Sequence, residues 1–127
     1  MKRDMELVRD LLLKIGEADR PLNFSEMLRP DIDDNARALA EYHMAMLVDE
    51  VGFVRGIDAS SMDGRDWIEL ELTWHGQDFL DSIRDPTVWN RTQDGAKKLG
   101  GVTFDMFIGL AKEYAKAEVK KRLGLDL

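Results

Sequence analysis

The run Ile68-Glu69-Leu70-Glu71-Leu72-Thr73-Trp74-His75-Gly76-Gln77-Asp78-Phe79-Leu80-Asp81 decides the fold. It alternates apolar and acidic residues as far as Leu72, which is typical of a strand with one buried face. Thr73 then offers an N-cap, so we expect a helix to follow the strand directly. The pattern predicts two strand faces, one with Ile68, Leu70 and Leu72 and the other with Trp67, Glu69 and Glu71.

The residues upstream predict a helix and a first strand. A helical pattern runs from Asn35 to Glu50, ends at Gly52, and is followed by strand-forming residues from Phe53 to Arg55. An Asp-Gly turn signal lies between this strand and the next. A helix, a β-hairpin and a return helix are the plan of a winged-helix domain. The predicted core stripe of the 35–50 helix is Ala36, Leu39, Ala40, His43, Leu47 and Val51.

The remaining patterns are helical, with spacing that predicts helices over 4–15, 24–28, 87–99 and 104–123. We therefore expect an α+β, mostly helical fold. A winged-helix-like core with a β-hairpin wing should occupy 1–85. A C-terminal two-helix extension, 86–127, should pack on it.

Composition narrows the class of protein. The 127 residues include no cysteine, which excludes disulfides, zinc–thiolate sites and thiol catalysis. The charged N-terminus lacks the apolar core of a signal peptide, and no apolar run reaches membrane-spanning length. We expect a cytoplasmic protein that does not enter a membrane.

Charge is unevenly distributed along the chain, whose formal net charge is −7. Residues 1–88 hold 10 Lys and Arg against 20 Asp and Glu, a balance of −10, and residues 89–127 hold 8 against 5, a balance of +3. The acidic total argues against general binding of polyanions, which depends on Lys and Arg. The asymmetry fits either head-to-tail self-association or solvated helix faces.

Several segments together resemble a known family. They are the Met1-Lys2-Arg3-Asp4-Met5 start, residues 42–54, Leu72-Thr73-Trp74-His75-Gly76 with the following residues to Asp85, Thr87-Val88-Trp89-Asn90, and residues 96–101. The chain resembles a domain-of-unknown-function family of bacterial and prophage proteins that is winged-helix in type. The Leu-Thr-Trp-x-Gly run is the most specific part. The resemblance implies the fold and brings no catalytic residues.

One hypothesis is recognition of DNA. In a winged-helix reader, the helix 35–50 would enter the major groove and the hairpin would touch the backbone. The candidate contacts are Asn35, Arg37, Arg55 and Arg65. However, the outward face of that helix carries acids at Asp34, Glu41 and Asp49, which would repel phosphates. The predicted fold supports recognition of DNA, and the acidic charges of the helix argue against it.

The same outward face suggests a protein partner, with a small apolar strip made of Ala38, Tyr42, Ala45 and Met46. Small residues let another helix approach closely, and Tyr and Met are favoured at interfaces. The alternative is that the C-terminal helices of the same chain cover this strip.

The last predicted helix is a second interface candidate. Phe107 and Tyr114 belong to a wide apolar band on a helix that is also rich in lysine. Docking on its own domain, pairing with a second subunit and contact with DNA phosphates are the three alternatives.

No residues suggest catalysis, a metal or a cofactor. His43 falls in the core stripe and should be buried and hydrogen-bonded, whereas His75 should be partly exposed. Two histidines without carboxylates at metal-ligand spacing do not predict a metal site. Trp74 and Trp89 should be core residues, and Trp67 should either be exposed at the wing or pack on the extension.

We expect a non-enzymatic regulatory or adaptor module that acts through protein contacts, with self-association as a homodimer. No cofactor and no small-molecule substrate are indicated. The alternative is a winged-helix DNA-binding transcriptional regulator of bacterial or prophage origin.

Overall fold

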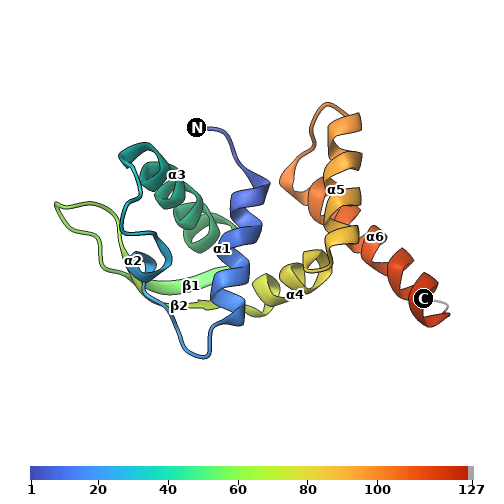
Figure 1. Ribbon diagram of the computed structural model, residues 1–127, viewed down its shortest axis with the longest axis horizontal. Helices are drawn as coiled ribbons and strands as arrows, with labels where there is room; N and C mark the ends of the chain where they lie inside the picture. The colour runs from blue at the N-terminus through green and yellow to red at the C-terminus, as the bar shows by residue number, and fades with distance from the viewer. Residues whose placement is uncertain (126–127) are drawn as a thin grey trace. The chain divides into compact units, whose positions relative to one another are not determined.

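The computed structural model describes residues 1–125 (Figure 1). Its contacts divide the chain into two compact units. Unit 1 is Met1–Asp78, and unit 2 runs from Phe79 to the end of the described chain. The predicted division at 85/86 stays a prediction, and the last two residues of the predicted extension lie outside the described residues.

Three helices open unit 1, each beginning at a polar cap. In α1 (Met5–Glu17), the Asp4 carboxylate accepts the backbone N–H groups of Glu6 and Leu7, and the apolar stripe Val8, Leu11, Leu12 and Ile15 is buried. The short α2 (Phe24–Met27) begins with a capping box between Asn23 and Glu26. The third helix, α3 (Asp34–Ala45), is capped by Asp33.

The predicted 35–50 helix changes its winding before it ends. After Ala45 the chain continues as a π-helix, η1 (Met46–Val51), and stops at Gly52, whose φ of 72° is left-handed. Ala40, His43, Met44 and Leu47 are buried. Ala36 of the predicted core stripe is exposed, because the buried face of α3 begins one turn later, at Ala40.

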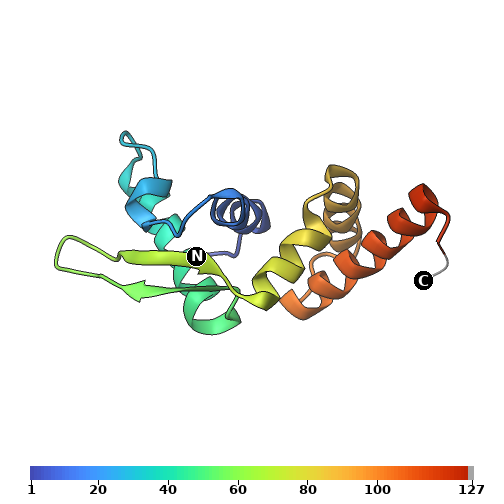
Figure 2. The ribbon, with the colours of Figure 1, turned by 90° about the horizontal axis from the view of Figure 1, so that it is seen from below.

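The hairpin follows as predicted. β1 (Val54–Asp58) and β2 (Trp67–Leu72) pair antiparallel, and Figure 2 shows them side by side with their connection, 59–66, extending beyond them. Leu22, between α1 and α2, adds a single bridge to Leu70 of β2 through two backbone hydrogen bonds of 3.1 and 2.7 Å. Helix, bridge, two helices and hairpin follow one another, and the winged-helix assignment stays a prediction. The α+β, mostly helical fold is confirmed.

A β-bulge in β2 corrects the predicted strand faces. The register changes between Arg55 and Ile57, so Glu69 and Leu70 together oppose Gly56. Glu69 adopts a left-handed φ of 56°, which accommodates the extra residue. The alternation shifts by one at this point, so Trp67 is buried together with Leu70. Trp67 is therefore no wing-tip anchor, since only 2% of it is exposed and its ring meets that of Phe24 edge-on at 5.1 Å.

The Leu-Thr-Trp-x-Gly run joins β2 to α4 (Trp74–Ile83). The Thr73 hydroxyl donates to the Gly52 carbonyl at 2.6 Å and accepts the Gly76 N–H at 3.1 Å. A Cβ on Gly76 would lie 1.9 Å from the carbonyl oxygen of Phe53, so only glycine fits this first turn. Trp74, two residues before Gly76, points elsewhere and is 85% exposed, which overturns its prediction as a core residue.

Unit 2 contains α5 (Pro86–Lys98) and α6 (Phe104–Leu123), which pack together. Asp85 caps α5, and Thr103 caps α6. The rings of Trp89 and Phe107 meet at 5.6 Å between the two helices. The prediction that Trp89 is a core residue is confirmed, because it is buried.

Candidate protein-interaction surfaces

The first candidate surface is the strip predicted on α3, made of Ala38, Tyr42, Ala45 and Met46. The helical spacing places all four on one face, and each is half-buried. The Tyr42 ring meets the His43 ring edge-on at 5.4 Å. Asp34 and Asp49 are exposed near the two ends of the strip. The strip is thus an apolar surface with acidic neighbours.

Glu41, next to this strip, connects α3 to the hairpin. Its carboxylate accepts the backbone N–H of Arg65 at 3.2 Å. The Arg65 guanidinium lies over the ring of the buried Trp67, 5.5 Å from the ring centre. Glu41, an acid of the outward face, is therefore hydrogen-bonded to the hairpin connection. Arg65, a candidate DNA contact, stacks on the ring of Trp67.

The other candidate DNA contacts do not form one basic cluster. Arg55 lies opposite Glu71 in the hairpin and forms an ion pair with it at 3.6 Å. Asn35 is exposed in the first turn of α3, and Arg37 is half-buried. Residues 1–78 hold 9 Lys and Arg against 18 Asp and Glu, a formal charge of −9. This unit would approach a phosphate backbone with net repulsion.

The two candidate residues on α6 are used inside unit 2. Phe107 is buried against Trp89. Tyr114 is half-buried, with the Arg91 guanidinium 5.0 Å from its ring centre. A Cβ on Gly95 would lie 2.9 Å from the Tyr114 hydroxyl oxygen, so the Tyr114 side chain packs closely against Gly95 of α5. These contacts join α6 to α5, and the three alternatives raised for this helix stay predictions.

A charged network also joins α5 and α6. Glu118, with a side chain only 8% exposed, contacts Arg122 at 2.9 Å and Arg91 at 3.8 Å. Arg122 reaches the α5 cap Asp85 at 2.6 Å, and this hydrogen bond keeps the pKa of the Asp85 carboxyl below its usual value. The lysine-rich helix α6 is therefore joined to α5 through the buried carboxylate of Glu118.

The histidines differ as predicted. His43 is fully buried, its Nε2 accepts the Asp4 N–H at 2.7 Å, and its Nδ1–H donates to the Leu39 carbonyl at 2.8 Å. His75 is exposed. Among residues 1–125, no three His, Asp or Glu side chains are grouped so that they could hold a metal ion. Within the same residues, no helix combines the length and apolar character needed to span a bilayer.

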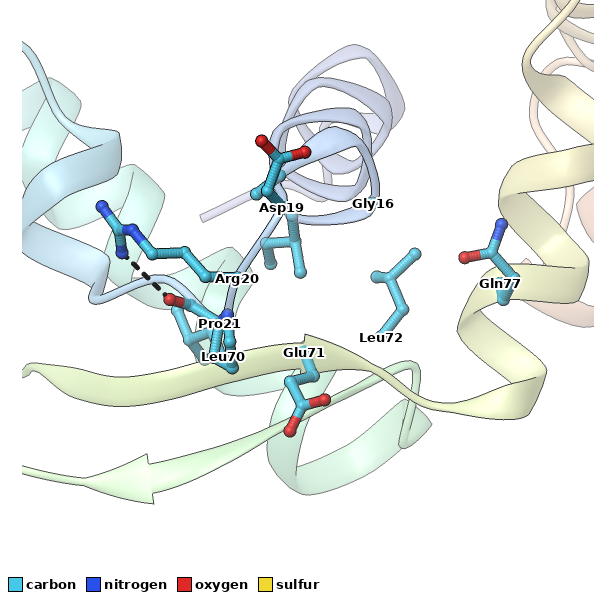
Figure 3. A pocket seen from close by; sticks show the side chains of 10 residues that line it. Gly16, Asp19, Arg20, Pro21, Leu70, Glu71, Leu72 and Gln77 are labelled. Atoms are coloured by element: carbon cyan, nitrogen blue, oxygen red, sulfur yellow. Dashed lines mark hydrogen bonds between the residues drawn. The ribbon is translucent and has the colours of Figure 1, made fainter.

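A polar hollow of about 230 Å³ lies between the end of α1, β2 and the start of α4 (Figure 3). Arg20, at its edge, donates to the Pro21 carbonyl at 3.1 Å and pairs with Glu26 at 2.6 Å. The bond to Arg20 and the Asn23 backbone N–H lower the pKa of Glu26 to about 2. Gln77 contributes an amide from α4, so the lining suits hydrogen bonding to a polar group.

Two features escaped prediction from the sequence. One is the exposure of Trp74, which the position of Gly76 could have indicated, since residues two apart lie on opposite sides of a helix and Gly76 faces the hairpin. The other is an apolar groove beside α1, whose members come from three separate segments. No single-segment pattern reveals such a groove.

Comparisons with known proteins agree with the resemblance found in the sequence. The model of a family described as "Hypothetical protein (DUF2513)" matches residues 2–103. An "Uncharacterized protein" from Haemophilus influenzae (strain ATCC 51907 / DSM 11121 / KW20 / Rd) is 28% identical over 123 residues, which cover 97% of this chain and 99% of the relative. No solved structure gave a significant match.

Proposed function

We propose that this chain, which belongs to the DUF2513 family of hypothetical proteins, is a non-enzymatic regulatory or adaptor module that acts through protein contacts. The observation that carries the proposal is the chemistry of α3. In a winged-helix reader this helix would face DNA, yet here it presents an apolar strip with acidic neighbours. A protein surface is the better match for such a strip.

Self-association is the form of contact that we favour. Ala38 and Ala45 are small enough to let a second helix come close, and Tyr42 supplies a ring of a type enriched at interfaces. A two-fold pairing of the strip with itself would satisfy the requirement that the same surface serve both partners. Because Phe107 and Tyr114 are already packed within unit 2, we assign the contact to α3 rather than to α6.

Light scattering coupled to size-exclusion chromatography, over a range of protein concentrations, tests self-association. We expect a dimer whose dissociation constant rises at least about tenfold in Ala45→Arg, because a charge would be forced into an apolar contact. The matched control is Ala117→Arg, which makes the same change at an exposed position of α6 and should leave the dimer intact. A wild-type chain that stays monomeric at every concentration would overturn self-association.

A DNA-binding transcriptional regulator is the second candidate function. It is favoured by the winged-helix order of elements and by Asn35 and Arg37 in the first turns of α3. Labelled mixed-sequence duplex DNA, titrated with the chain at low and at higher salt, provides the test by fluorescence anisotropy. Binding that weakens steeply with salt and is lost in Arg37→Ala would move this function to first place. We expect no binding even at low salt.

A further inference from the structure

A groove of about 360 Å³ runs along unit 1 beside the predicted strip and is separate from it. Three segments form it, namely α1, the chain from Met27 to Ile32, and the first half of α3. On α3 it uses Ala36, Leu39 and Ala40, whereas the strip uses Ala38, Tyr42 and Ala45. The two surfaces lie on different faces of the same helix, so different partners could occupy them.

The floor of the groove is apolar. Leu11, Met27 and Ala40 are buried beneath it. Half-exposed aliphatic side chains form its walls, namely Leu7, Leu28, Ile32 and Leu39. Side chains of this kind, gathered from three segments around one hollow, are the lining that apolar anchors of a bound helix require.

The rim of the groove is acidic on the α1 side. Asp4, Glu6 and Asp10 line it there. The two basic side chains of the lining already have acceptors, because Lys14 Nζ donates to the Met27 carbonyl at 3.3 Å and Arg29 contacts Asp31 at 3.8 Å. The surrounding unit carries a formal charge of −9. The lining holds three acids against two bases, so the groove combines an apolar floor with a small net negative charge in a strongly acidic unit.

We infer that this groove docks a basic amphipathic helix of a partner protein. Apolar anchors spaced i, i+3 or i+4, and i+7 would enter between Leu7, Ile32 and Leu39, and flanking Lys or Arg would face Asp10 and its neighbours. This inference names a partner class and a surface beyond the proposed function. It holds whether or not the chain self-associates.

Fluorescence anisotropy with a labelled helical peptide of about 15 residues tests this inference on the full chain. The probe has Leu at the anchor positions and Lys elsewhere. One control peptide has the same residues in scrambled order. The other has Glu in place of every Lys. We expect the probe to bind and both controls to bind at least about tenfold more weakly. If the probe does not bind, or binds no better than the scrambled peptide, the inference is wrong.

Variants of the chain locate the binding. Asp10→Lys should weaken the probe about fivefold, since exposed charge pairs contribute modestly. Ile32→Ala should weaken binding of the probe more than Asp10→Lys does, because it removes part of one apolar wall of the groove. Glu17→Lys, an exposed change on the same α1 helix outside the groove, should have no effect. Binding that both groove variants leave unchanged would overturn the assignment.

Methyl NMR of the full chain keeps this test separate from the test of self-association. Addition of the probe should shift the methyl signals of Leu7, Ile32 and Leu39. Shifts confined to the Met46 methyl would instead place the probe on the α3 strip and refute the groove. The oligomeric state measured by light scattering decides the proposed function independently of either result.

Discussion

In unit 1 the tightest constraints come from the backbone, whereas in unit 2 they come from charged side chains. Gly76 lies against the Phe53 carbonyl, and the buried His43 ring joins two backbone groups. In unit 2, Glu118 holds one arginine from each of two helices. Backbone contacts tolerate almost no added atoms but are insensitive to salt. Ion pairs tolerate changes of shape but weaken as ions screen them. The units should therefore respond differently to the same kinds of mutation.

The largest effect is expected from Gly76→Ala. A methyl group 1.9 Å from the Phe53 oxygen forces the start of α4 away from the hairpin. We expect a loss of about 3 kcal/mol in the free energy of unfolding, at the upper end of overpacking costs, measured by urea denaturation. The same change at Gly109 in α6, where nothing lies within 4 Å, should stabilise by about 1 kcal/mol. Equal effects at Gly76 and Gly109 would contradict the claim that the backbone contact at Gly76 leaves no room for a side chain.

The next effect is that of His43→Leu. The substitution keeps an apolar side chain in the core but removes the bonds to the Asp4 N–H and the Leu39 carbonyl. Two lost hydrogen bonds should lower the free energy of unfolding by about 2 kcal/mol, with little dependence on salt. His75→Leu, at the exposed histidine, should change it by less than about 0.5 kcal/mol. A strong salt dependence of the His43→Leu effect would contradict an effect that comes from hydrogen bonds to the backbone.

A smaller effect is expected from Glu118→Gln in unit 2. Loss of the charge weakens the contacts with Arg91 and Arg122, which are themselves about half exposed, so we expect a cost of about 1.5 kcal/mol. Thermal unfolding at low and high salt should show this difference shrinking as salt increases. Glu113→Gln, which alters only an exposed pair with Lys116 at 3.7 Å, should have little effect at either salt concentration.

The smallest effect sharpens the comparison, because it concerns an exposed ion pair in unit 1. The pKa of Glu26 is lowered to about 2, chiefly by its bond to Arg20. The ionised form is the one that the fold favours, so this contribution is present above the ordinary pKa and is lost as pH falls towards 2. In Arg20→Ala, carboxyl NMR should show the pKa of Glu26 raised, although the backbone N–H of Asn23 still holds it below the ordinary value. An unchanged pKa would exclude Arg20 as the cause.

Periodicity and caps predicted the larger elements of this chain well. The 3.6-residue patterns located α1, α3, α5 and α6, the Thr73 cap located the start of α4, and the Asp-Gly turn located the hairpin. These are local signals, and the structure follows them. The acidic face of α3 was also visible from spacing alone.

Features that depend on tertiary contacts were missed. The bulge at Glu69 moved Trp67 into the core, and no glycine at position 69 announced a left-handed residue there. The single bridge from Leu22 was not predicted, because one residue that exchanges two backbone hydrogen bonds with Leu70 needs no strand pattern of its own. The groove beside α1 draws on three segments that only folding brings together. Sequence therefore predicted the helix face proposed for protein contact, but not the groove.

The bulge in β2 also restricts how this sequence can change length. Removing Glu69 would restore regular pairing with β1 and keep Trp67 on the face of Leu70, because residues two apart in a regular strand share a face. Regular pairing with every residue kept would instead turn Trp67 outward, and the Phe24 ring would lose its partner. An insertion in the 59–66 connection leaves that register untouched. Relatives of this chain should therefore vary in length in the 59–66 connection, and should shorten the stretch from Trp67 to Leu70 only by the single residue that forms the bulge.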